Sequence, residues 1–206
     1  MQTMMKSLSP IGFSKNMLTI LSSAADEVLG HLRTNSSKKD WQPKENEDIC
    51  GDTNLVLESF QDSKRLEEKY GKLGSLGLAT RIGEASFRCF VRQEGEDYLL
   101  TDMNYRLMSL NQRFLFGLEK VAEFVNLNLK WQIDVFDNLE EWVWQISHHP
   151  DSWQRNQVWA FYFSGLLREY LSWTSGGRYF VLSPQLIDNN SEIVHQIRIS
   201  KTPLGN

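Results

Sequence analysis

The chain has few cysteines, no excess of basic charge and no long apolar run. Its 206 residues include two cysteines, too few for a disulfide framework, so we expect a reducing, cytoplasmic compartment. Acidic residues outnumber Lys and Arg by 26 to 22, and the net charge of −4 argues against nucleic-acid binding, which requires a basic surface. Because no apolar run approaches the roughly 20 residues of a membrane span, we expect no transmembrane segment.

Sequence signatures of catalysis are also missing. The chain has no nucleophile elbow, no glycine-rich dinucleotide fingerprint and no helical His–Glu metal motif. The pair His148–His149 and His195 are the candidate metal ligands, but three histidines without a cysteine fall short of the usual tetrahedral zinc site. We therefore predict no metal site and no catalytic residues, and we favour a binding protein over an enzyme.

Aromatic residues, at 12% of the chain, are what the sequence has in quantity. Four of the seven tryptophans lie between positions 142 and 159, around the pair His148–His149. Such a concentration suggests an apolar pocket for a flat or hydrophobic ligand.

The predicted ligand-binding residues combine this cluster with the apolar side of an earlier helix; they are Phe87, Cys89, Phe90, Trp144, His148, His149, Trp159 and Phe163. Each has a plainer interpretation. The aromatic residues also suit a packed core, the histidine pair suits a solvated turn, and Cys89 suits a buried structural thiol.

Hydrophobic periodicity predicts the elements. Apolar residues spaced by three and four predict helices over 14–33, 55–70, 76–95, 109–128 and 156–174, with Gly71 ending the second. Alternation predicts strand pairs over 131–135 with 142–146 and over 178–182 with 193–199. Small residues at Ala79, Gly83 and Ser86 would let another backbone approach closely. This order predicts an α+β fold with helices packed on an antiparallel sheet, divided into an N-terminal helix and linker (1–39) and one domain (40–204).

Six stretches, in their order and spacing, resemble the 4-vinyl reductase-like family of small-molecule-binding domains; they are 66–71, 77–88, 100–107, 117–119, 165–169 and 173–177. The resemblance covers most of the chain, about residues 40 to 204. It implies a fold similar to the small subunits of the TRAPP vesicle-tethering complexes, with a hydrophobic cavity between helices and sheet.

The same resemblance implies a function. It suggests a non-catalytic carrier or assembly factor in chlorophyll-protein and photosystem biogenesis, which holds a tetrapyrrole or lipid-like molecule. Its partners would be photosystem or other membrane-protein assembly intermediates, at the surface of a photosynthetic membrane, with a homodimer as an option. Two alternatives stay open: a ligand-independent interaction scaffold, and a tetrapyrrole vinyl reductase, for which no hydride or electron source is visible.

Overall fold

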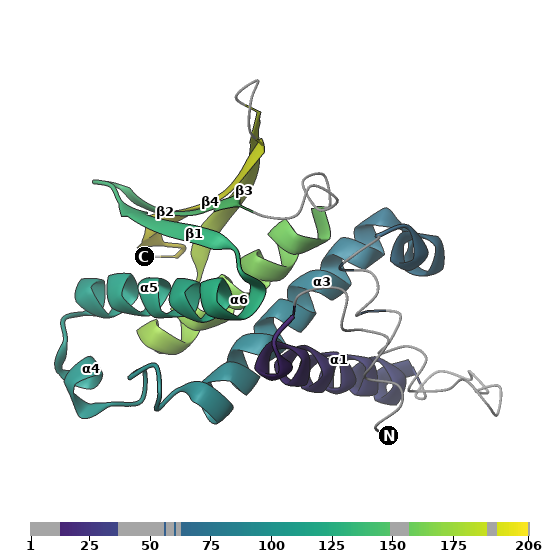
Figure 1. Cartoon of the computed structure of the whole chain (residues 1–206), viewed down its shortest axis with the longest axis horizontal. Helices are drawn as coiled ribbons and strands as arrows, with labels where there is room; N and C mark the ends of the chain where they lie inside the picture. Colours follow the sequence, from purple (N-terminus) through teal and green to yellow (C-terminus); the bar gives the residue numbers. More distant parts are fainter. Residues whose placement is uncertain are drawn as a thin grey trace.

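Helices stacked beneath one face of a four-stranded antiparallel sheet form the fold (Figure 1). The computed structural model describes residues 13–36, 56, 60, 63–148, 157–188 and 193–205. The strands, which lie in the order β1-β2-β4-β3, are β1 (Gln132–Asp137), β2 (Glu141–His148), β3 (Phe180–Asp188) and β4 (Ile193–Pro203). The α+β class and both strand pairs are therefore confirmed.

Five helices lie around this sheet in the described part of the chain; they are α1 (Lys15–Ser36), α3 (Lys64–Glu94), α4 (Met103–Leu107), α5 (Leu110–Leu129) and α6 (Gln157–Ser175). α5 and α6 contact the sheet, α3 packs on α6, and α1 packs on α3. α5 begins at a capping box, in which the Ser109 hydroxyl accepts from the Gln112 backbone N–H. The short helix α4 was not predicted.

Gly71 does not end a helix as the periodicity predicted. α3 runs from Lys64 to Glu94, and Gly71, with φ of 72°, marks a kink within it. A positive φ favours glycine, so the sequence located the break correctly but not the continuation beyond it. Most of the predicted 55–70 helix before Lys64 lies outside the described residues.

Helices cover only one face of the sheet in the described part of the chain. On β2, Trp142 and Trp144 point toward the helices, and their partners on β4 are Ile199 and Ile197. All four side chains are at most 1% exposed. The alternate positions carry polar residues such as Gln145, which pairs with Gln196 on the opposite face. This alternation is what an antiparallel sheet with one covered face requires.

α3 and α6 cross with their backbones in direct contact. A Cβ atom built on Gly83 would lie 1.9 Å from the carbonyl oxygen of Tyr162. One built on Gly165 would lie 2.0 Å from the carbonyl oxygen of Thr80. Only glycine fits at either position, which confirms the close approach predicted at Gly83. We refer to this contact as the Gly83–Gly165 crossing.

An arginine on α3 ties three helices together. Arg88 donates to Glu27 of α1 at 2.7 Å and approaches Glu169 of α6 at 3.2 Å. The apolar side of α1, including Met17 and Leu21, is fully buried in the same core as α3 and α6. The predicted boundary between 1–39 and 40–204 lies outside the described residues and stays a prediction.

None of the helices that the structure describes is both long enough and apolar enough to cross a membrane.

The Gly83–Gly165 crossing predicts a large effect of one methyl group. Gly165→Ala should lower the free energy of unfolding by about 3 kcal/mol, because neither backbone can retreat without disturbing its helix. Urea unfolding followed by circular dichroism measures this loss. Gly77→Ala is the control, since a Cβ there meets nothing within 4 Å. Gly77→Ala should raise the free energy of unfolding by up to about 1 kcal/mol, because alanine has a higher helix propensity than glycine. Equal effects of the two substitutions would contradict the crossing.

The Arg88 bridge predicts a pH-dependent contribution from Glu27. Burial alone would raise the pKa of Glu27, but the hydrogen bond and charge of Arg88, with Arg92 and His31, lower it below its ordinary 4.5. A lowered carboxyl pKa stabilises the fold above the unfolded-state pKa, and this stability is lost as pH falls through the folded-state pKa.

Glu27→Gln should therefore reduce the free energy of unfolding by about 0.5–1 kcal/mol at neutral pH. The difference from wild type should disappear in acid below pH 4.5. Urea titrations from pH 7 to pH 3 measure it, with the exposed Glu119→Gln as control. A difference independent of pH would rule out the ion pair as its source.

Candidate functional site

The predicted aromatic residues are all buried, but they form two clusters rather than one pocket. Trp144 and Phe163 lie 5.0 Å apart between ring centroids, and Trp159 stacks on Phe163 at 5.5 Å. Phe87 and Phe90, 6.2 Å apart, form a separate group nearer the other end of α6. None of the ring contacts recorded among the described residues joins these two groups directly. Side chains that are at most 3% exposed fill both clusters.

Neighbouring aromatic residues complete each cluster. Phe60 and Tyr162 pack against Trp159 at 4.7 and 5.7 Å. In the second cluster, Phe124 lies 4.6 Å from Phe90, and Tyr170 lies 5.6 Å from Phe87. These rings pack at the separations of an ordinary protein core. Whether the predicted aromatic residues bind a ligand stays a prediction.

The other predicted residues are placed only in part. Cys89 is buried and accepts a hydrogen bond from Arg92 at 3.3 Å. His148 ends β2, although its side chain is not described, and His149 lies outside the described residues. In the described part of the chain, no three His, Cys, Asp or Glu side chains converge on a metal-sized site.

Two buried hydroxyl groups in the first cluster have no hydrogen-bond partner among the described residues. They belong to Tyr162 on α6 and Ser86 on α3, and both side chains are fully buried. Burial raises the pKa of Tyr162, and the Ser86 hydroxyl beside it offsets only part of that rise, although the two hydroxyls do not meet the geometry of a hydrogen bond. Tyr170 on the same helix differs, since its hydroxyl donates to the carbonyl oxygens of Arg113 and Phe114 at 2.7 and 2.8 Å.

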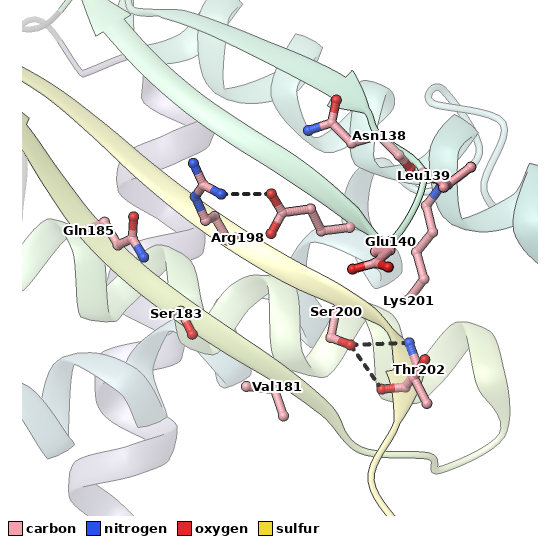
Figure 2. Close-up of a pocket in the computed structure, with 11 residues that line it drawn as sticks. Asn138, Leu139, Glu140, Val181, Ser183, Gln185, Arg198, Ser200, Lys201 and Thr202 are labelled. Atoms are coloured by element: carbon pink, nitrogen blue, oxygen red, sulfur yellow. Dashed lines mark hydrogen bonds and ion pairs between the residues drawn. The ribbon is translucent and has the colours of Figure 1, made fainter.

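A polar groove of about 890 Å³ follows the uncovered face of the sheet. Figure 2 shows Ser183 and Gln185 of β3 and Arg198 and Ser200 of β4 along it. Arg198 donates to the Glu141 carboxylate at 2.8 Å, so the central charges neutralise one another. The groove is wide and its lining is mainly polar, with Leu139 and Val181 as its apolar side chains.

A smaller recess of about 420 Å³ lies where α3, α6 and the edge strand β3 meet; we call it the α3–α6–β3 recess. β3 and α6 give it an apolar wall of Leu182, Pro184 and Phe161. Each of these side chains is half-buried. Arg81 and Arg168 lie at its rim.

Two hydroxyl groups line the same recess. Thr80 and Ser164 donate to the carbonyl oxygens of Leu76 and Ala160 at 3.0 and 2.7 Å, within their own helices. These bonds use their protons, so neither hydroxyl is an activated nucleophile.

No sequence pattern predicted this recess. A signal was present, because Gly77, Arg81 and Glu84 share one face of α3 by their spacing of four and three. On α6, Phe161 and Arg168 are seven residues apart and share a face in the same way. Only the fold shows that these two faces meet beside β3.

No protein-family model matches the sequence, and no curated protein does. Among solved structures, a Cs H-NOX mutant with 4-cyano-L-phenylalanine at site 5 is 14% identical, with a TM-score of 0.47 over 93% of this chain and 96% of that one. An oxygen-binding H-NOX domain related to soluble guanylate cyclases is 13% identical, with a TM-score of 0.43 over 93% and 94% of the two chains. A mutant H-NOX from T. tengcongensis is 14% identical, with a TM-score of 0.42 over 92% and 96%. At this level, the likeness carries no inference about a ligand.

The resemblance to the 4-vinyl reductase-like family and the TRAPP subunits was wrong, since no family model matches and the similar structures are H-NOX domains. The glycines in the stretches that carried the resemblance have structural roles in this fold. Gly83 and Gly165 allow two helices to cross, and Gly176 and Gly177 take positive φ angles of 73° and 98° just after α6. The chlorophyll and photosystem context and the photosynthetic membrane were implied by that family and are withdrawn with it, whereas a tetrapyrrole or lipid-like ligand stays a prediction.

The two buried tyrosines of α6 give opposite predictions. Tyr162→Phe removes a hydroxyl that lacks a partner and should raise the free energy of unfolding by about 1 kcal/mol. Tyr170→Phe removes a hydroxyl that serves two carbonyl groups and should lower it by about 1–2 kcal/mol. Urea unfolding of both variants measures the contrast. If Tyr162→Phe destabilised as much as Tyr170→Phe, its hydroxyl would have a partner after all.

Proposed function

We propose that the chain is a non-catalytic binding protein that takes a hydrophobic small molecule in the α3–α6–β3 recess. The observation that carries this proposal is the recess itself, a concave volume of about 420 Å³ with one apolar wall. Small-molecule pockets commonly range from about 300 to 1,000 Å³ and combine apolar walls with a few polar groups.

The composition of the recess supports a binding role. Phe161, Leu182 and Pro184 provide apolar surface that a ligand can cover, which is the main source of favourable free energy in such a site. Thr80 and Ser164 direct their protons to helix carbonyls, so the recess favours holding a molecule over reacting with it.

The aromatic interior has a supporting role in this proposal. Tyr162 and Phe163 anchor α6 from its buried side, and the preceding Phe161 is only half-buried and lines the recess. The rigid interior keeps Phe161 in place, which reduces the conformational entropy lost on binding. The sequence-predicted residues would then hold the site in position instead of contacting the ligand.

A filling substitution tests the proposal. Gly77 lines the recess, has ordinary helical geometry, and would place a Cβ atom where nothing lies within 4 Å. Gly77→Leu should therefore occupy the recess without straining α3. We expect it to weaken binding of the neutral apolar probe N-phenyl-1-naphthylamine at least about tenfold, a loss of about 1.4 kcal/mol. Probe fluorescence in a titration of the full chain measures this.

Gly30→Leu is the matched control. Gly30 lies on the exposed face of α1, and a Cβ atom there also meets nothing within 4 Å. Both variants replace a helical glycine and should keep or raise the melting temperature. Equal probe affinity in Gly77→Leu and Gly30→Leu, or no binding by the wild-type chain, would refute binding in the recess.

A further inference from the structure

The hydrogen-bonding groups of the α3–α6–β3 recess select the chemistry of its ligand. Thr80 and Ser164 have committed their protons to helix carbonyls, so they can only accept. Among the described side chains that line the recess, the N–H donors are those of the Arg81 and Arg168 guanidinium groups, which accept nothing. A ligand that satisfies this rim must bring an acceptor, and an anion satisfies it best.

The two arginines are available for a ligand to different degrees. Arg81 is exposed, and within the described residues no side chain pairs with it. Arg168 contacts Glu84 at 3.4 Å, longer than the 2.7 Å between Arg88 and Glu27. Among the described residues that line it, Glu84 is the one acidic side chain, so these residues give the recess an excess of one positive charge in a chain whose net charge is −4.

Shape and charge together point to an amphiphile. Leu182 and Pro184 come from the edge strand β3 and Phe161 comes from α6, while both arginines come from the helices. A molecule with a hydrocarbon body and one anionic end can cover the wall and meet the guanidinium groups together. A carboxylate suits them, because its two oxygens match the paired N–H groups of one guanidinium.

We propose that the α3–α6–β3 recess binds a carboxylic acid with a hydrocarbon chain, such as a medium-chain fatty acid, with its carboxylate between Arg81 and Arg168. This inference rests on the proposed function and adds the ligand class. Glu84 then competes with the ligand for Arg168 and limits its affinity.

A competition experiment tests the proposal. It measures how well decanoate, decanol and decyl phosphate displace N-phenyl-1-naphthylamine from the full chain. Decanoate should bind at least about tenfold more tightly than decanol, since only its carboxylate forms charge-assisted hydrogen bonds with the guanidinium groups. Arg168→Gln and Arg81→Gln should each weaken the binding of decanoate about tenfold. Each should change the affinity for decanol less than about twofold. Arg178→Gln, which removes an exposed charge outside the recess, should leave both unchanged.

Glu84→Gln gives the sharpest result. It removes the competing carboxylate, so decanoate should bind about three- to tenfold more tightly while decanol stays constant. A purely structural role for Glu84 would not improve binding of one head group alone.

The outcomes separate the two proposals. If decanol and decanoate bind equally in every variant, the recess binds apolar molecules and the carboxylate proposal is wrong. If decyl phosphate binds more tightly than decanoate and depends on the same arginines, the head group is a phosphate and the carboxylate class is wrong. If no compound displaces the probe, the proposed function fails first.

Discussion

The backbone contact between α3 and α6 is the constraint on which the rest of the structure depends. Gly83 and Gly165 let the two helices touch without side chains between them, and this fixes both their separation and their rotation. Thr80, whose carbonyl oxygen lies against Gly165, also lines the α3–α6–β3 recess. The recess therefore adjoins the crossing, and β3 completes its wall.

A second glycine contact fixes α5 relative to α6 in a related way. A Cβ atom on Gly117 would lie 2.3 Å from the Tyr170 hydroxyl, so glycine makes room for that ring. The hydroxyl then serves the carbonyl groups of Arg113 and Phe114 inside α5. α6 thus meets one neighbour by backbone contact and the other by a buried hydrogen bond. These contacts hold the platform of helices on which the sheet lies.

Hydrophobic periodicity predicted the helices and strands whose pattern lies within a single segment of the chain. The helices that became α1, α5 and α6, and both strand pairs, were found because each buries one face. The continuation of α3 through Gly71 and the five-residue α4 depend on tertiary packing, and the sequence did not reveal them. The aromatic residues were the strongest signal, yet they identified the core, because large rings are buried wherever a core forms. The recess needed residues from three elements, and only the fold brings those together.

Arginine shows how the same residue type serves structure in one place and remains available in another. Arg88 has carboxylates at 2.7 and 3.2 Å on two other helices, so its guanidinium group joins those helices. Arg168 has one carboxylate at 3.4 Å, and Arg81 has none in the described part of the chain. Both line a concave, partly apolar surface. Exposed, loosely paired arginines contribute little to folding, so in our proposal the charges of Arg81 and Arg168 serve the ligand instead of the fold.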